Sequence, residues 1–270
     1  MPRPILTDHV VSADGTRLAV DHCGDGPPVV LVHGALTGRR HPLLATLATE
    51  LATCWTVFNY DRRGRGGSGN TAPYGVEREL DDLDAVISQA GGTAMVFGGS
   101  SGAALALRAA ARSSRGITRL ALWEPPYHVG AQAPSLPEDF ADQLGRLVAS
   151  DRRDDAVELF MTAAAEVPRA AIPRLRSQPM WAEAVHLAHT LTHEARVMGP
   201  ANALPAQLLA QVRQPALVLY GGASPPWMAA AALAVARALP HATTHCLPGQ
   251  THGVDPDTLV PELMAFFAGA

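Results

Sequence analysis

The apolar residues of this chain gather in short runs that alternate with longer stretches in which apolar positions recur at helical spacing. Residues 29–32 read Val-Val-Leu-Val, a continuous run typical of a strand buried on both faces of a sheet. Asp14-Gly15 favours a tight turn between the first two strands. We predict eight strands, over residues 9–12, 16–22, 29–32, 55–60, 95–97, 117–123, 216–220 and 243–247.

The stretches between these strands predict helices. In residues 77–89 the side chains of Leu80, Leu83 and Ile87 recur every three or four positions, which places them on one helical face. Further helices are expected over residues 42–52, from 103 onward, and over 227–239 and 258–267. Because short buried strands alternate with helices, we predict an α/β fold with a mostly parallel sheet covered by helices on both faces.

The alternation stops at Pro125 and resumes near residue 215. Residues 137–212 predict four or five helices with no strand between them, punctuated by prolines that begin or break helices. A helical block inserted between two strands is most simply a cap over the C-terminal edge of the sheet, where open α/β sheets bind ligands. The predicted organisation is a core from residues 1–124 and 213–270, with a helical cap over 125–212.

Composition and charge exclude several classes of protein. Charged residues make up 17% of the chain, the net charge is −4 and the arginines are scattered, so no basic surface for nucleic acid is expected. The three cysteines (Cys23, Cys54 and Cys246) lie far apart, which favours a reducing cytoplasm over disulfides or a cysteine metal site. No run reaches the roughly 20 apolar residues that a membrane span needs. We expect a cytoplasmic protein with a small-molecule substrate, without metal or cofactor, and leave its oligomeric state open.

Candidate chemistry begins at residues 98–102, Gly-Gly-Ser-Ser-Gly, which lie between a predicted strand and a predicted helix. They fit the pattern G-x-S-x-G with Ser100 at its centre. A strand that turns directly into a helix strains the residue at the turn, and flanking glycines remove side chains that would clash there. The serine oxygen then lies at a helix N-terminus, where backbone N–H groups favour negative charge. A structural glycine-rich turn fits the same letters, so the flanking elements carry the functional interpretation.

Three further landmarks each follow a predicted strand. They are His33-Gly34, the segment Asp61-x-Arg63-Gly64-x-Gly66, and the late His252. Together with Ser100, and in this order, they make the chain resemble the α/β-hydrolase fold superfamily, in particular its small serine hydrolases with a helical cap. The resemblance covers nearly the whole chain outside the cap, and it implies an eight-stranded, mostly parallel α/β-hydrolase sheet.

The resemblance also implies roles for individual residues. Ser100 would be the nucleophile and His252 the general base, since a histidine with an ordinary pKa of about 6.5 can take and return a proton. The backbone N–H groups of Ala35 and Ser101 would form the oxyanion hole. Substrate contacts are expected from four residues near these groups: His33, Gly34, Trp227 and Met228.

The acid of the triad is where the sequence departs from the family pattern. An aspartate usually follows the strand at 216–220, but Ser224 occupies that position, and a serine cannot carry the charge that steadies an imidazolium. Either the acid is missing or it comes from elsewhere. Glu124, at the end of the preceding strand, is the best alternative, and some superfamily members place their acid there. Asp255 and Asp257 are closer to His252 in sequence, but we expect them to cap the last helix.

Two other clusters have structural interpretations that we prefer. The arginine-glycine loop at 61–69 lacks the G-K-[ST] ending of a phosphate-binding loop, so we expect it to support the site structurally. His186, His189 and His193 share one helical face, but a metal site needs further ligands and a second shell. We expect these histidines to pack in the cap or line its pocket.

The function these features favour is a serine hydrolase that cleaves an ester, thioester or lactone of a small, mostly apolar molecule through an acyl-enzyme. Two alternatives stay open. One is the same fold catalysing acyl transfer, lyase or cyclisation chemistry. The other is a hydrolase-fold receptor that binds a ligand without turnover: the missing acid at Ser224 argues for it, and the presence of both Ser100 and His252 argues against it.

Overall fold

A single mixed sheet of eight strands forms the centre of the computed structural model, which describes residues 5–113 and 116–269. The strand order is β1-β2-β4-β3-β5-β6-β7-β8, and only the pairings of β1 with β2 and of β2 with β4 are antiparallel. The predicted fold class is therefore confirmed. The strands are β1 Leu6–Val11, β2 Arg17–Cys23, β3 Pro28–Val32, β4 Thr56–Tyr60, β5 Ala94–Gly99, β6 Ile117–Trp123, β7 Ala216–Gly221 and β8 Ala242–Leu247.

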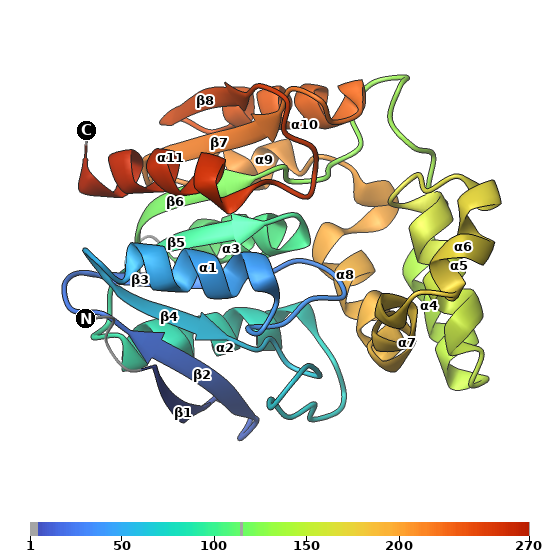
Figure 1. Cartoon of the computed structure of the whole chain (residues 1–270), viewed down its shortest axis with the longest axis horizontal. Coiled ribbons are helices and arrows are strands. Elements are labelled where there is room, and N and C mark those ends of the chain that lie inside the picture. The colour runs from blue at the N-terminus through green and yellow to red at the C-terminus, as the bar shows by residue number, and fades with distance from the viewer. Residues whose placement is uncertain (1–4, 114–115, 270) are drawn as a thin grey trace.

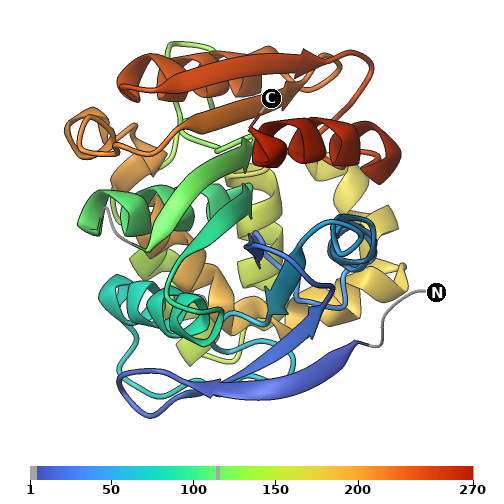
Figure 2. The same ribbon diagram turned by 90° about the vertical axis from the view of Figure 1, so that its left-hand side faces the viewer.

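Helices cover both faces of this sheet, and the strands divide their side chains between the two layers. In β3, Val30 and Val32 pack into one hydrophobic cluster while Val29 and Leu31 pack into the other, as the two-residue repeat of a strand requires. Figure 2 shows α1 and α11 on one side of the sheet and α2 and α3 on the other. The core helices are α1 Pro42–Leu51, α2 Val76–Gln89, α3 Ser101–Arg112, α10 Pro226–Ala238 and α11 Pro256–Ala268.

The segment between β6 and β7 forms a group of helices beside the sheet (Figure 1). Its side chains build a separate hydrophobic cluster that includes Phe140, Trp181 and Leu191. Leu36, which follows β3, packs against the same cluster, so the helices lie over the C-terminal ends of the parallel strands. The segments are α4 Phe140–Ala149, α5 Arg153–Ala163, α6 Ile172–Arg176, α7 Pro179–His186, α8 Leu191–Met198 and α9 Ala206–Leu209, with 3₁₀ turns at Arg169–Ala171, Ala188–Thr190 and Pro200–Asn202.

Six α-helical segments lie here where the sequence predicts four or five, in a span that the structure describes without a gap. The extra ones are short: α6 has five residues and α9 has four, because prolines interrupt the chain close to each. The last two helices also join the core. Val197 and Leu209 pack into the main cluster beneath the sheet, and Arg108 of α3 donates a hydrogen bond of 2.6 Å to the carbonyl of Val197.

Across residues 5–113 and 116–269, no helix is both long and apolar enough to cross a bilayer.

Candidate active site

Ser100 lies at the turn from β5 into α3 with a left-handed backbone conformation, φ 56° and ψ −128°. A residue other than glycine rarely adopts such angles, so the turn stores strain of the kind found at functional sites. The turn is tight because glycines flank it. A Cβ added at Gly98 would lie 2.7 Å from Ala103 Cα, and one at Gly102 would lie 2.2 Å from the carbonyl oxygen of Val32. The G-x-S-x-G pattern therefore lets β5, α3 and β3 meet around Ser100.

Glu124 follows β6, the strand next to β5, and also has a positive φ of 41°. Its side chain is fully buried, and both carboxylate oxygens have partners. Oε2 lies 2.7 Å from His252 Nδ1, and Oε1 accepts a hydrogen bond of 2.8 Å from the backbone N–H of Gly221. Since a carboxylate only accepts, Nδ1 carries a proton, and in the neutral form of the ring Nε2 of His252 keeps its lone pair. This is the tautomer that a general base needs.

Trp123 connects the three predicted triad residues. Its carbonyl accepts a hydrogen bond of 2.8 Å from the N–H of Ser100, and its indole N–H donates one of 3.0 Å to the carbonyl of His252. Glu124 is the next residue in the chain. The structure therefore brings Ser100, Glu124 and His252 to one edge of the sheet, although no hydrogen bond links the Ser100 hydroxyl to His252 in the described residues. Such contacts often tighten only when substrate binds.

Ser224 takes the position where the family usually has its acid. Its hydroxyl is buried without a hydrogen-bond partner in the described residues, and it lies next to Gly221, whose N–H binds Glu124. Asp255 makes no hydrogen bond to the His252 ring in the described residues. It is the N-cap of α11, accepting a hydrogen bond of 3.0 Å from the N–H of Asp257 as the sequence predicts.

Gly34 lies directly against the predicted nucleophile. A Cβ added at Gly34 would lie 2.8 Å from Ser100 Cβ and 3.4 Å from Ser100 Oγ, so any larger residue there would displace the serine. Ala35 follows Gly34, and Ser101 opens α3. In the described residues neither of their backbone N–H groups makes a hydrogen bond, so both donors are free to bind a developing oxyanion.

The ring of His33 is enclosed by protein and only 1% exposed. Nε2 accepts a hydrogen bond of 3.1 Å from the N–H of Arg62, and Nδ1 lies 3.1 Å from Arg65 Nη1. Burial, followed by the charges of Arg65 and Arg62, holds the pKa of His33 well below its usual value. This enclosed ring supports the loop after β3, and a substrate contact for His33 stays a prediction.

Trp227 and Met228 lie in the first turn of α10, and they are 2% and 8% exposed. The indole N–H of Trp227 donates to the carboxylate of Glu166 in the cap, and its ring lies edge-on to His128 at 5.3 Å. Trp227 therefore joins the core to the cap, and a substrate contact for either residue stays a prediction.

The arginine loop is structural, as expected. The side chains of Arg62, Arg63 and Arg65 are buried in ion pairs with carboxylates. In the cap, the ring of His193 stacks on Tyr74 with centroids 3.7 Å apart, and His189 Nε2 lies 2.9 Å from the carbonyl of Gly64. Within the described residues, no cluster of three or more potential metal ligands is present.

Sequence reasoning missed two contributors to this site, Trp123 and Glu194. The sequence identifies Trp123 only as the last residue of a predicted strand. No local pattern predicts the hydrogen bond between its indole and residue 252. Glu194 on α8 reaches Arg62 and Arg65 across more than 125 positions of sequence. A glutamate on the apolar side of a cap helix is the one sequence feature that points to such a partner.

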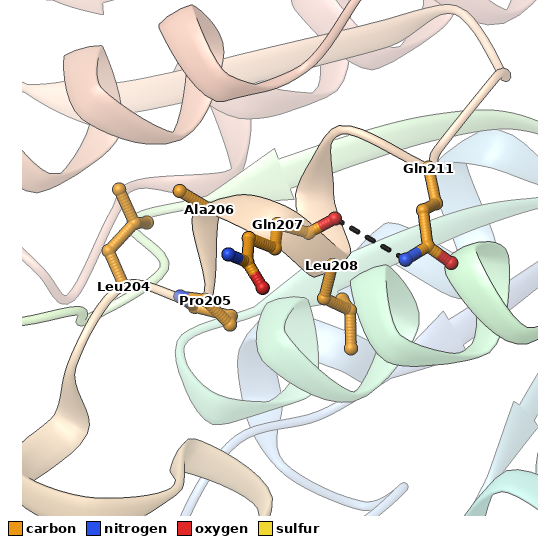
Figure 3. Close-up of a pocket in the computed structure, with 6 residues that line it drawn as sticks. All are labelled: Leu204, Pro205, Ala206, Gln207, Leu208 and Gln211. Carbon is orange, nitrogen blue, oxygen red and sulfur yellow. Dashed lines mark hydrogen bonds between the residues drawn. The ribbon is translucent and has the colours of Figure 1, made fainter.

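An open depression lies elsewhere, along α9 (Figure 3). All of its lining residues come from one short stretch of chain, and none of the residues proposed for the active site is among them. The lining is Leu204, Pro205, Ala206, Gln207, Leu208 and Gln211. We assign no chemistry to it.

Comparison with known proteins supports the fold and its family. A hydrolase from Sphaerobacter thermophilus, solved as an alpha/beta hydrolase, is 48% identical; the match covers 96% of this chain and 100% of that one, with a TM-score of 0.89. A thermophilic esterase from Thermogutta terrifontis is 21% identical over 97% of this chain and 98% of its own, with a TM-score of 0.73. That second likeness shows a shared fold.

Among curated proteins, the proline iminopeptidase PfmaB of Pestalotiopsis fici is 30% identical over 117 residues. The matched part spans 42% of this chain and 42% of that protein, less than half of either. The model of the alpha/beta hydrolase family matches residues 29–262, from the third strand to the last helix. The chain therefore belongs to the alpha/beta hydrolase family.

Proposed function

We propose that this protein is a serine hydrolase of carboxylic esters, thioesters or lactones, with Ser100 as nucleophile, His252 as general base and Glu124 as the acid. The observation that carries the proposal is the buried Glu124 carboxylate, 2.7 Å from Nδ1 of His252, at the same edge of the sheet as the strained Ser100. It also removes the main argument for a ligand-binding receptor, because an acid contacts His252 although position 224 is a serine.

The proposed reaction has two halves. Ser100 Oγ attacks the substrate carbonyl carbon while His252 Nε2 takes the hydroxyl proton, and the Ala35 and Ser101 N–H groups stabilise the oxyanion. The intermediate collapses as His252 gives its proton to the leaving alcohol, which leaves an acyl-enzyme on Ser100. Water then attacks this ester, with His252 again taking and returning a proton. Glu124 stabilises the imidazolium and holds its orientation throughout.

A mostly apolar substrate is proposed because the cap presents an apolar cluster to the loop that carries Ala35. Leu36, one residue after the proposed oxyanion donor Ala35, packs against the cap cluster around Phe140 and Trp181. An apolar group of the substrate placed between this loop and the cap would lose water on binding. Exposed free thiols at Cys54 and Cys246 favour a reducing compartment, and we propose the cytoplasm.

A fluorophosphonate probe and p-nitrophenyl esters of increasing acyl length test the proposal. Wild-type protein should label once, on Ser100 by peptide mass spectrometry, and should hydrolyse the esters. Ser100→Ala should do neither while keeping its far-UV circular dichroism. A wild-type protein that neither labels nor hydrolyses any ester would refute the assignment, and retained activity in Ser100→Ala would move the nucleophile elsewhere.

A further inference from the structure

Two buried arginines hold the loop that carries the proposed oxyanion donor Ala35. Arg62 Nη1 donates to the carbonyl of His33 at 3.1 Å. Arg65 Nη1 donates to the carbonyls of Gly34 and Thr37, the second at 3.2 Å. Both guanidinium groups are almost completely excluded from solvent. The loop after β3 is therefore fixed from below through its carbonyl oxygens.

The hydrogen bond from Arg65 to the Gly34 carbonyl sets the direction of the Ala35 N–H. The Gly34 carbonyl and the Ala35 N–H belong to one trans peptide unit, which is planar, so the two groups point in opposite directions. Gly34 O also accepts a hydrogen bond of 3.0 Å from the Thr37 hydroxyl, on the same side of the unit. Donors that hold this oxygen toward the arginines aim the neighbouring N–H away from them, and Gly34 itself lies against Ser100.

Arg65 depends on the cap for its counter-charge. Its Nη2 contacts Oε1 of Glu194, which is itself 1% exposed, and no other carboxylate pairs with Arg65 in the described residues. The second oxygen of Glu194 lies 3.1 Å from Arg62 Nη1. Burial, followed by the charge of Arg62, lowers the pKa of Arg65 to about 9, while the charge of Glu79 raises it.

The same loop meets the cap a second time. Leu36 has a left-handed φ of 55° and packs against the cap cluster, one residue after Ala35. The peptide that carries the proposed donor thus lies between an ion pair with α8 and an apolar contact with the cap.

We propose that Glu194 is a positioning residue for the oxyanion hole, acting through Arg65 and the Gly34 carbonyl to aim the Ala35 N–H at the reacting carbonyl. This inference rests on the proposed hydrolase function. It makes the cap a part of the catalytic geometry as well as a cover for the substrate.

The test compares two variants of the full chain that each remove one buried carboxylate charge. Glu194→Gln weakens the partner of Arg65. Asp82→Asn weakens the partner of Arg63, which is equally buried and bound at 2.7 Å, but Arg63 makes no contact with residues 33–37 in the described residues. For both we would measure the thermal midpoint, kcat and KM on a p-nitrophenyl ester, and inhibition by a trifluoromethyl ketone. The serine adds to the ketone to form a tetrahedral adduct whose oxygen is negatively charged. The affinity for the ketone therefore measures how well the oxyanion hole binds that charge.

Both variants should lose thermal stability. Only Glu194→Gln should lose kcat, by about 10- to 100-fold, which is part of the 10²–10³ that removal of a whole oxyanion donor costs. Its KM should change little, and its affinity for the ketone should fall by a factor similar to that in kcat. A Glu194→Gln variant with wild-type kcat, or with losses in kcat and ketone affinity no larger than those of Asp82→Asn, overturns the inference.

Should Glu194→Gln fail to fold, the double variant Arg65→Gln, Glu194→Gln removes both charges together. We expect it to fold with the same low kcat and weak ketone binding, and wild-type kcat in the folded double variant overturns the inference. A wild-type protein that neither hydrolyses esters nor binds the ketone refutes the proposed function itself. That result is distinct from an active wild type whose Glu194 variants stay active.

Discussion

The indole N–H of Trp123 donates a hydrogen bond to the carbonyl of His252, across 3.0 Å. The histidine sits on a loop between β8 and α11, and its side chain is 43% exposed. A loop residue of this kind needs an anchor to keep its ring in one place. Trp123 gives the loop that anchor from the end of β6, next to Glu124.

Trp123→Phe keeps an aromatic ring but removes the indole N–H from the His252 carbonyl and leaves part of the buried volume empty. Beyond the cost of that empty volume, which Trp55→Phe also incurs, we expect a stability loss of about 1 kcal/mol, the usual net value of one hydrogen bond, and a fall in kcat of up to about 10²-fold from misplacement of the imidazole. Trp55→Phe is the matched control, because Trp55 is also buried but precedes β4, at the opposite edge of the sheet. Urea unfolding and steady-state kinetics measure the two effects. Equal kcat values for the two variants would show that the indole hydrogen bond does not serve His252.

The strained backbone of Ser100 predicts that the turn needed for a nucleophilic serine lowers the free energy of unfolding. Ser100→Gly removes the side chain that opposes φ 56°, which relieves about 1–3 kcal/mol of backbone strain in the folded protein. Glycine also raises the entropy of the unfolded chain, and this effect lowers stability. We expect Ser100→Gly to be more stable than Ser100→Ala by about 1 kcal/mol, with both inactive. The measurement is urea unfolding of the two variants side by side. A less stable glycine variant would contradict a strained turn.

Buried neutral histidines predict sensitivity to mild acid. Burial lowers the pKa of His193 to about 3, and His33 is also held well below its usual pKa, so the folded protein resists protons that the unfolded chain binds. The free energy of unfolding should be highest above about pH 6.5. It should fall as the pH is lowered toward 3, by up to about 1.4 kcal/mol per pH unit for each histidine. His193→Phe keeps the stacking on Tyr74. Its unfolding free energy should therefore fall less steeply than that of wild type between pH 7.5 and 5, whereas parallel curves would contradict the assignment.

Much of the fold could be predicted because its causes are local. Four consecutive apolar residues at 29–32 predict a strand with two buried faces, and the strand at 216–220 repeats that pattern in its first four residues. Ser100 was visible for a similar reason, since G-x-S-x-G describes a backbone turn that the adjacent strand and helix make necessary. The position of Glu124 at a strand end made it a candidate before any distance was known.

What could not be predicted depends on contacts between distant residues. Arg65 and Glu194 are 129 positions apart, and no local sequence pattern predicts that a carboxylate of the cap pairs with an arginine of the core. The contacts of the buried His33 ring with Arg62 and Arg65 belong to that same network, and no local pattern predicts them. The helices of the cap were undercounted because single turns such as α6 are too short to show a repeat.

A carboxylate restored at position 224 should recover part of the activity that loss of Glu124 removes. The Ser224 hydroxyl is buried without a partner in the described residues, close to Gly221, and the loop is joined to Gln250 by a hydrogen bond of 2.9 Å from the N–H of Ala223. We expect Ser224→Asp combined with Glu124→Gln to exceed Glu124→Gln alone in kcat. Ser224→Asn in the same background is the control, because it has the shape without the charge. Equal kcat values for the two double variants would show that a carboxylate at position 224 does not interact with His252.

The most direct measurement is kcat of Glu124→Gln on the best p-nitrophenyl ester. The amide keeps the size of the side chain but cannot stabilise an imidazolium, and it favours the wrong histidine tautomer. By analogy with the Asp-to-Asn change in a serine protease, the loss should approach about 10⁴-fold in kcat. If Glu124 is the acid of the triad, a folded Glu124→Gln protein will show that loss with KM little changed. A folded Glu124→Gln protein with near wild-type kcat would contradict it.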